Sequence, residues 1–376
     1  MRICIVSQNV SPGILTFRRD LISQLVALGH EVYAFAIDYT EGTCDAVRNL
    51  GATPVSYTLN KAGLNPILDV VDTIKLYYRF KEINADVVLS SFVKPSIYAS
   101  LAASIARVPR RIAMLEGLGY IHTEGLEGSK FKKKILRAIH GVLCSFGYYF
   151  ADSVIFLNHD DPKDLKKLAY IPQRKIKVLG AIGLKLEDFP FSPVSEPMPL
   201  RFIFVGRLLK EKGIREFIDA SRIVLKTTKN VEFIILGGID PSNPSSLSQQ
   251  QLDNILCENI LTYPGHVTNV LDWLAASHVF VLPSYREGFP RSTQEAMAIG
   301  RAIITTDVPG CRDTVINEVN GYLSRPQSAD DLAEKMLKFV TDRSLAQSMG
   351  LESYNIAKSK FNVDDVNSRL IDILMN

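Results

Sequence analysis

Apolar runs of strand length alternate with helical patterns along almost the whole 376-residue chain. This alternation favours parallel sheets whose strands are joined by crossover helices. Most of the runs are continuously apolar, as in strands that are covered on both faces. The predicted strands span residues 3–7, 31–37, 86–91, 111–115 and 153–157 in the first half, and 201–206, 231–238, 278–284 and 302–308 in the second. The pattern therefore predicts an α/β protein with two doubly wound sheets.

A proline-rich stretch separates the two sets of strands. It begins at Phe189-Pro190-Phe191-Ser192-Pro193 and continues to Pro199, and proline interrupts regular elements. The length also exceeds that of one ordinary core. We expect a first domain at 1–188, a second at 189–352, and a C-terminal helix at 353–376 that packs back on the first domain. In open α/β sheets a ligand binds at the carboxyl ends of the strands, which predicts a site in the crevice between the domains.

Charge and cysteine content exclude several classes of protein. The 43 Lys and Arg residues nearly balance the 40 Asp and Glu residues, so the composition gives no support for a nucleic-acid partner. Five cysteines, an odd number without a C-x-x-C pair, indicate neither a disulfide framework nor a zinc site. The chain opens on a strand rather than a signal peptide, and the longest uncharged apolar run, 138–151, is too short to span a bilayer. We expect a cytoplasmic location.

The most informative motif directly follows the predicted strand at 278–284. It runs from Glu287 to Glu295 and continues into A-M-A-x-G. Because this loop opens a helix, free backbone N–H groups near Gly288 to Ser292 offer a seat for a phosphate. The two carboxylates could face one ligand, and a carboxylate accepts two hydroxyl hydrogen bonds, as a sugar or a ribose diol requires. A helix-start charge and a solvated helix face are the structural alternative.

This run resembles the signature of family 4 retaining glycosyltransferases of GT-B fold, in which two glutamates stand eight residues apart before A-M-A-x-G. The resemblance implies two Rossmann-like domains that face each other across a cleft. It implies that Glu287 contacts the donor sugar, that Glu295 binds the nucleotide ribose, and that Gly288, Phe289 and Pro290 belong to the donor site.

A second element, Gly206-Arg207 followed by Lys212-Gly213, is similar to the G-R-x-x-x-x-K-G element of the same family. The implied role of Arg207 and Lys212 is to hold the donor pyrophosphate and to stabilise the leaving diphosphate. Fixed cations do stabilise charge that develops on phosphate oxygens. No D-x-D triplet occurs, so we expect no metal and no cofactor beyond the donor itself. Solvated charges at an exposed strand end are the alternative.

Weaker elements extend the resemblance to both halves of the chain. Gly238 stands at the family's glycine-rich turn near the nucleotide, and His266 and Val267 resemble a turn whose backbone reads the base. Gly13 occupies the place of the glycine loop after the first strand, where the family usually has two glycines.

Glu116 marks a departure from the common family pattern. Many members carry a histidine near the reacting carbon at this place, whereas this chain reads Glu116-Gly117-Leu118-Gly119. The E-G-L-G form resembles bacterial N-acetylgalactosaminyl transferases that use isoprenoid-diphosphate acceptors. We therefore take Glu116 as a catalytic candidate and His122 as a second one. A helix-start residue and a loop residue are the structural alternatives.

A basic and then apolar segment follows in the first half. Its cations are Lys130, Lys132, Lys133, Lys134 and Arg137. With Phe131, Ile135 and Leu136 dipping below the headgroups, such a helix can lie on an anionic bilayer and meet a lipid-linked acceptor. A second basic set in the same half could assist; it comprises Lys61, Lys75, Arg79 and Lys81. A surface helix packed on the first sheet is the alternative.

Together these patterns predict a retaining, metal-independent glycosyltransferase, peripheral on the inner face of the cell membrane. It would move a hexose or N-acetylhexosamine from a UDP-sugar to a lipid-diphosphate-linked saccharide, in O-antigen or other polysaccharide biosynthesis. A nucleotide-sugar 2-epimerase of the same fold is the enzymatic alternative. A two-domain sugar-binding protein of periplasmic type would need export, and a dinucleotide oxidoreductase would need the G-x-G-x-x-G that this chain lacks.

Overall fold

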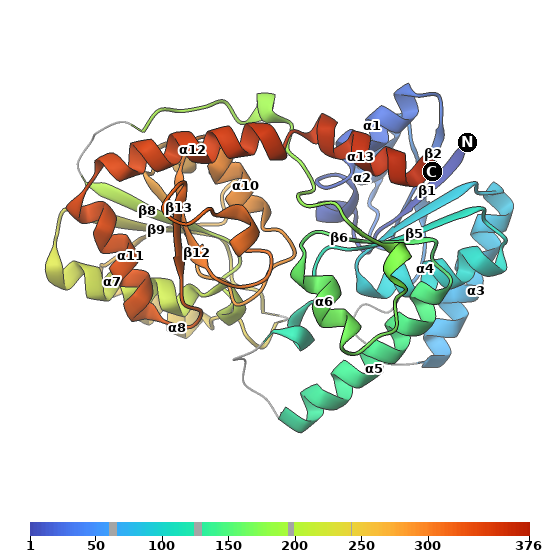
Figure 1. Ribbon diagram of the computed structural model, residues 1–376, viewed down its shortest axis with the longest axis horizontal. Helices are drawn as coiled ribbons and strands as arrows, with labels where there is room; N and C mark the ends of the chain where they lie inside the picture. Colours follow the sequence, from blue (N-terminus) through green and yellow to red (C-terminus); the bar gives the residue numbers. More distant parts are fainter. Residues whose placement is uncertain (60–65, 124–129, 195–198, 242) are drawn as a thin grey trace. The chain divides into compact units, whose positions relative to one another are not determined.

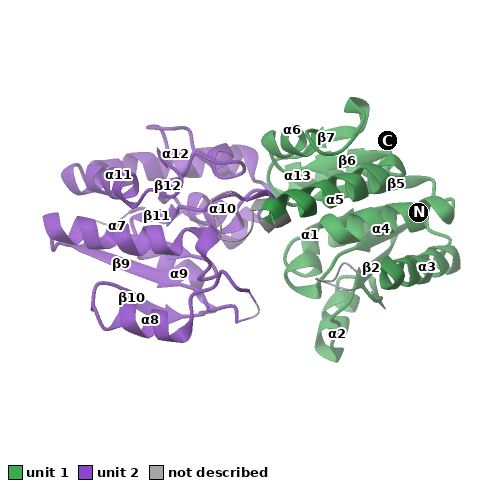
Figure 2. Cartoon of the chain, turned by 90° about the horizontal axis from the view of Figure 1, so that it is seen from below, with its two compact units in different colours: residues 1–121, 129–182, 363–376 green, residues 122–128, 183–362 purple. Residues whose placement is uncertain are grey.

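The computed structural model describes residues 1–59, 66–123, 130–194, 199–241 and 243–376 (Figure 1). The chain divides into two compact units (Figure 2). The first comprises residues 1–121, 129–182 and 363–376, and the second comprises residues 122–128 and 183–362.

The first unit contains a seven-stranded parallel sheet in the order β3-β2-β1-β4-β5-β6-β7. Its strands are β1 (Arg2–Val6), β2 (Glu31–Ala36), β3 (Thr53–Ser56), β4 (Val87–Ser91), β5 (Arg110–Leu115), β6 (Ser153–Phe156) and β7 (Ile176–Val178). Its helices are α1 (Arg19–Ala27), α2 (Glu41–Asn49), α3 (Pro66–Ile83), α4 (Val93–Ile105), α5 (Lys130–Tyr149), α6 (Asp160–Lys166) and α13 (Val363–Met375), with the short turns η1 (Val10–Ile14), η2 (Tyr120–His122) and η3 (Gln173–Lys175). The strand order reverses between β1 and β4, where open sheets place their ligands.

The second unit contains a six-stranded parallel sheet in the order β10-β9-β8-β11-β12-β13. Its strands are β8 (Leu200–Val205), β9 (Val231–Leu236), β10 (Thr262–Gly265), β11 (Val279–Leu282), β12 (Ala302–Thr306) and β13 (Gly321–Ser324). Its helices are α7 (Ile214–Thr227), α8 (Gln249–Leu256), α9 (Val270–Ala275), α10 (Arg291–Ala298), α11 (Ala329–Thr341) and α12 (Ser344–Lys360), with the turns η4 (Leu186–Asp188), η5 (Lys210–Lys212) and η6 (Arg312–Thr314). Here the order reverses between β8 and β11.

The predicted α/β class with two doubly wound sheets is confirmed, and each predicted strand coincides with an observed one to within two residues at each end. The central strands pack their continuous apolar runs on both faces, and the residues of β4 and β12 are buried throughout. Four short strands escape the prediction: β3, β7, β10 and β13. Each lies at an edge of its sheet.

The division between the units differs from the predicted boundary by a few residues. It falls between Ile182 and Gly183 instead of at 188/189, and the proline-rich stretch belongs to the second unit. The reason is packing: the Phe191 ring lies 4.7 Å from the Tyr354 ring, centroid to centroid, and Arg301 donates to the carbonyl of Ser192.

The chain also returns to the first unit later than predicted, at Val363 instead of residue 353. The helix α12 runs without interruption to Lys360 in the second unit, so the return is made by α13 alone. This helix is fixed to the first unit by hydrogen bonds from Gln24 to Asp364 (2.6 Å) and from Arg110 to the carbonyl of Ile373 (3.0 Å). In the described part of the chain, no helix has the length and apolar character needed to cross a membrane.

Candidate active site

The loops that follow β8, β9 and β11 lie at the carboxyl edge of the second sheet. These strands are neighbours in the order β9-β8-β11, so the loops that carry the two predicted motifs start side by side. Gly237 shows how closely they approach: its φ is +139°, and a Cβ there would stand 1.9 Å from the carbonyl oxygen of Gly206. Only glycine permits this contact, and Gly238 then accepts a hydrogen bond from the N–H of Leu208 (3.0 Å).

The structure brings Lys212 and Glu287 together. Lys212 Nζ lies 2.6 Å from Glu287 Oε1, and the Ser284 hydroxyl donates to the same oxygen at 2.7 Å. The backbone N–H of Glu287 donates to the carbonyl of Pro309 (3.1 Å). The side chains of Lys212 and Glu287 are only 24% and 13% exposed. One cation and one hydroxyl therefore fix this carboxylate at the strand ends.

The loop after β12 contacts the backbone of Glu287. Gly310 has a φ of +78°, and a Cβ there would lie 2.2 Å from the carbonyl oxygen of Glu287. Ser284 and Gly310 are two site residues that sequence reasoning missed. The turn signal of Pro309-Gly310 after a predicted strand could have indicated the second.

Arg207 pairs with a residue that the sequence did not single out. Its Nη1 lies 2.8 Å from Asp240 Oδ2, and the arginine side chain is 59% exposed. An exposed ion pair of this kind contributes about 0–1 kcal/mol. Arg207 can therefore exchange Asp240 for a ligand phosphate at small cost.

Helix α10 begins at Arg291, directly after Pro290, whose side chain makes no capping hydrogen bond. The N–H groups of that turn therefore lie where the sequence predicts a phosphate seat. Glu295 accepts a hydrogen bond from Arg291 Nε at 2.9 Å. Burial raises the pKa of Glu295, and the charge and hydrogen bond of Arg291 oppose that rise.

The predicted base-reading turn, His266 and Val267, follows the edge strand β10, and His266 is exposed. The Tyr263 hydroxyl donates to the carbonyl of Gly237 (3.0 Å), and the N–H of Gly237 donates to the carbonyl of Gly265 (2.9 Å). These bonds tie the end of β10 to the glycine turn after β9.

In the first unit, Glu116 is buried in an ion pair with Arg18. Arg18 also donates to the Ser91 hydroxyl (3.2 Å) and to the Met114 sulfur (3.1 Å). The side chains of Arg18 and Glu116 are 2% and 5% exposed. Burial raises the pKa of the Glu116 carboxyl, while Arg18 and Ser91 act to lower it. The sequence did not indicate Arg18, because its F-R-R-D context is typical of the start of a surface helix.

Glu116 and Gly13 both lie at the carboxyl edge of the first sheet. The second carboxylate oxygen of Glu116 and the hydroxyl of Ser7 are buried, and neither has a hydrogen-bond partner among the described residues. A Cβ at Gly13 would stand 2.0 Å from the Ser7 hydroxyl oxygen, so a larger residue there would displace that hydroxyl. The second candidate, His122, is also buried.

The predicted basic segment forms the first part of α5. Lys134 is exposed and Lys133 is half-buried. Arg137 donates from Nε to the carbonyl of Ile121 (2.6 Å). The side chains of Lys130 and Lys132, and the whole of Lys61, lie outside the described residues.

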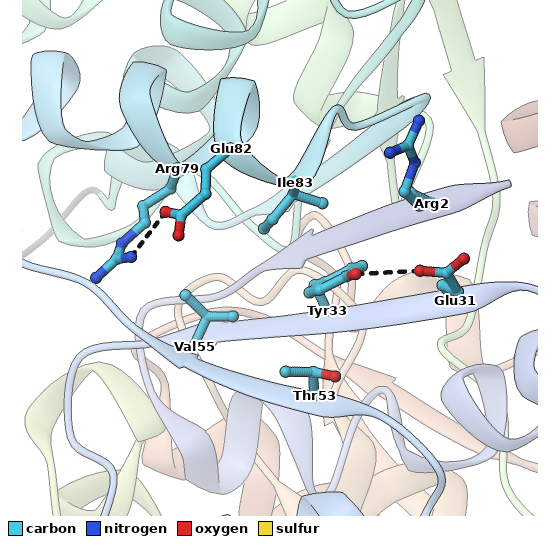
Figure 3. Close-up of a pocket in the computed structure, with 8 residues that line it drawn as sticks. All are labelled: Arg2, Glu31, Tyr33, Thr53, Val55, Arg79, Glu82 and Ile83. Carbon is cyan, nitrogen blue, oxygen red and sulfur yellow. Dashed lines mark hydrogen bonds and ion pairs between the residues drawn. The ribbon is translucent and has the colours of Figure 1, made fainter.

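A hollow of about 480 Å³ in the first unit lies away from these residues (Figure 3). It opens at the amino ends of β1, β2 and β3, and its polar groups pair with one another: Arg79 with Glu82, and Tyr33 with Glu31. In the described part of the chain, no three His, Cys, Asp or Glu side chains come together as metal ligands.

Comparison with known proteins identifies the class. Residues 185–355 match the family described as glycosyl transferases group 1. The N,N'-diacetylbacillosaminyl-diphospho-undecaprenol alpha-1,3-N-acetylgalactosaminyltransferase of Campylobacter jejuni is 30% identical over 359 residues, which cover 92% of this chain and 91% of that protein. The UDP-Gal:alpha-D-GlcNAc-diphosphoundecaprenol alpha-1,3-galactosyltransferase of Escherichia coli is 26% identical and covers 82% and 81%.

Solved structures share the fold over the whole length. The crystal structure of Anabaena Alr3699/HepE in complex with UDP superposes with a TM-score of 0.79 at 18% identity and covers 100% of both chains. Sucrose-phosphate synthase from Thermosynechococcus elongatus gives 0.76 at 18% identity and covers 99% of this chain and 98% of that one. The fold is that of GT-B glycosyltransferases, as predicted.

This chain belongs to the group 1 glycosyltransferases, and it is a glycosyltransferase. The family resemblance seen in the sequence is confirmed. The relatives are transferases, which supports that interpretation over an epimerase.

Proposed function

We propose that this enzyme is a retaining, metal-independent transferase of bacterial surface-glycan synthesis. It moves a hexose or N-acetylhexosamine from a UDP-sugar to a saccharide linked to a lipid diphosphate, at the inner face of the cell membrane. The observation that carries the proposal is the Lys212–Glu287 pair at the carboxyl edge of the second sheet, in a chain whose relatives carry the names of lipid-diphosphate-linked acceptors.

The diphosphate of the donor would bind where positive charge gathers. Lys212 and Arg207 follow the same strand, β8, and the first turn of α10 would add N–H donors. Because the leaving UDP gains negative charge as the glycosidic bond breaks, fixed cations lower the barrier to its departure. Their charge does the work that a bridging metal does elsewhere.

The donor sugar and the ribose would bind the two glutamates. Lys212 and Ser284 hold one oxygen of Glu287 in place, which orients the carboxylate for sugar hydroxyls. Glu295 would exchange part of its contact with Arg291 for the two ribose hydroxyls.

The transfer step needs no protein nucleophile. The acceptor oxygen forms a bond to the anomeric carbon on the face from which UDP departs. The bond between the anomeric carbon and the UDP oxygen breaks, and its electron pair stays on that phosphate oxygen. A donor phosphate oxygen takes the acceptor proton, and the configuration is retained. We assign Glu116 to the acceptor side, with Arg18 holding one of its oxygens and leaving the other for a substrate hydroxyl.

One assay tests the whole proposal. The protein is incubated with a panel of UDP-sugars and undecaprenyl-diphosphate-linked saccharides, and UDP release is followed together with the product's anomeric configuration by NMR. We expect turnover with an α-linked product from an α-linked donor. Interconversion of free nucleotide sugars without an acceptor would instead support the epimerase, and inversion at the anomeric carbon would refute retention.

The basic part of α5 supports the membrane location, since cations near an anionic surface contribute about 1 kcal/mol each and are screened by salt. Replacing Lys132, Lys133 and Lys134 by Gln should weaken co-sedimentation with anionic liposomes at low salt and leave UDP affinity unchanged. If the wild type and the triple variant pellet equally, this segment has no role in membrane binding.

A further inference from the structure

In the first half of helix α3, polar side chains are buried and apolar side chains are exposed. The residues that face the protein interior include Asp69, Asp72 and Thr73, which are buried. The residues on the opposite face are aliphatic or aromatic and exposed: Ile67 (74%), Val70 (58%), Val71 (40%), Ile74 (49%) and Tyr78 (65%). Their spacing of three or four residues places them in one stripe along the helix. A helix normally buries its apolar face, so this stripe requires an explanation.

Specific partners hold the carboxylates inward. Asp69 accepts from Lys94 Nζ and from the Tyr98 hydroxyl, both at 2.7 Å. Asp72 accepts from the Thr58 hydroxyl at 2.5 Å. Because buried carboxylates are stable only when paired, these bonds fix the rotation of α3, and the apolar stripe is thereby held outward.

Helix α5 carries a second exposed stripe along its whole length. It comprises Phe131, Ile135, Ile139, Val142, Phe146 and Tyr149. The opposite face of α5 is seated by close contacts: a Cβ at Gly141 would lie 2.3 Å from the carbonyl oxygen of Leu168, and one at Gly147 would lie 2.8 Å from Ile97 Cα. The helix therefore cannot roll its outer stripe into the core.

The two stripes belong to one layer of the first unit. Helix α4 packs against both α3 and α5, and it lies between them in Figures 1 and 2. The two helices that flank α4 thus each add an apolar stripe to the exposed surface of the first unit. We call this surface, defined by the two stripes, the α3–α5 face.

We propose that the α3–α5 face inserts its apolar side chains into the interface of a lipid bilayer, and that α3 is a membrane-docking element equal to α5. The choice of a bilayer rests in part on the proposed function, because the acceptor proposed there carries a lipid. Charge supports the same choice: α5 contains no acidic residue, and Lys75 and Lys134 stand exposed beside the stripes. A second copy docked face to face would oppose like charges, whereas anionic headgroups complement them.

Apolar insertion differs from electrostatic docking in its salt dependence. The full chain should float with vesicles of phosphatidylcholine alone, and should do so at high salt, because apolar burial is not screened. The variant Val70→Gln/Val71→Gln/Ile74→Gln should lose at least about tenfold in vesicle partitioning, since three apolar side chains no longer leave water. A matched control, Leu28→Gln/Ile316→Gln/Val319→Gln, changes three exposed apolar residues elsewhere and should partition like the wild type.

Each outcome decides the proposal. Unaltered circular dichroism and UDP affinity in the α3 variant show that it is folded. If that variant floats like the wild type, or if the wild type ignores neutral vesicles at high salt, membrane insertion by α3 is refuted. Wild-type dimers that the α3 substitutions dissociate in sedimentation equilibrium would identify a second copy as the occupant and refute it too.

A measurement of sugar transfer tests the proposed function independently of membrane docking. On an acceptor with a short, water-soluble tail, the α3 variant should work like the wild type, because the substituted residues lie outside the candidate active site. A protein that floats but transfers sugar to no lipid-diphosphate-linked acceptor would refute the function and leave the docking face standing.

Discussion

The buried pair of Arg18 and Glu116 offers a test of both the fold and the assignment of Glu116. Replacing Glu116 by Ala leaves the guanidinium of Arg18 without its ionic partner, at a place where the arginine side chain is 2% exposed. Removing one member of a buried ion pair costs about 3–5 kcal/mol. For a domain of 150–250 residues, each kcal/mol lowers Tm by about 2–4 °C, so we expect a fall of roughly 6–20 °C.

Replacing both members by apolar residues of similar volume should restore most of this loss. In Arg18→Met/Glu116→Leu no charge is left buried, and such exchanges are often neutral or stabilising. The carbonyl of Phe17, the hydroxyl of Ser91 and the sulfur of Met114 then lose the hydrogen bonds that Arg18 donates, which should hold the recovery to within about 1–2 kcal/mol of the wild type.

Thermal unfolding followed by circular dichroism measures the effect. The single tryptophan, Trp273, lies in the second unit, so its fluorescence follows that unit separately and should respond less to Glu116→Ala. An unchanged Tm for Glu116→Ala would refute the argument that the pair is buried and strong.

Turnover of the stable double variant then decides the role of Glu116. If Glu116 meets the acceptor, the double variant should bind UDP like the wild type and still fail in transfer. If transfer returns together with stability, Glu116 serves the fold and is not catalytic.

Three further outcomes are expected. Glu295→Ala should weaken UDP binding by roughly 1–3 kcal/mol in calorimetry. Because burial raises the pKa of Glu295, its carboxylate is protonated at a higher pH than that of an ordinary glutamate, and the UDP affinity of the wild type should begin to fall at that higher pH as the pH is lowered. Glu295→Gln should abolish this pH dependence. Arg207→Ala or Lys212→Ala should each lower kcat by roughly 10²–10³, and an effect on KM alone would reduce them to binding residues. Turnover should survive EDTA, and loss that magnesium restores would refute metal independence.

The sequence predicted the interior of both sheets and missed their four edge strands, three of them for the same physical reason. Central strands are covered on both faces, so they appear as continuous apolar runs. The edge strands β3, β7 and β10 carry partly exposed residues, and β7 has only three residues. A run so short and so mixed cannot be distinguished from a loop by its pattern.

The site residues were found where the chemistry is local in sequence. The E-G-F-P and G-R-x-x-x-x-K-G elements each follow a strong strand, and parallel sheets bring strand ends to one edge. Local sequence did not show which residues would pair, because the partners are far apart in the chain: 75 residues separate Lys212 from Glu287, and 98 separate Arg18 from Glu116. Arginine is rarely buried, so no local pattern could have indicated that Arg18 lies in the core.

The periodicity of the sequence could not predict which face of α3 is buried. A helical pattern shows that one stripe is polar and the other apolar, and the default assignment puts the apolar stripe inside. Here the default fails because Lys94 and Tyr98 on α4 bind Asp69. Turning the helix over would bury Val70 and Ile74, but it would break the bonds that Lys94 and Tyr98 make to Asp69. The first unit therefore keeps its ion pair and exposes its apolar stripe, and contact with a bilayer is what would recover the energy of that exposed surface.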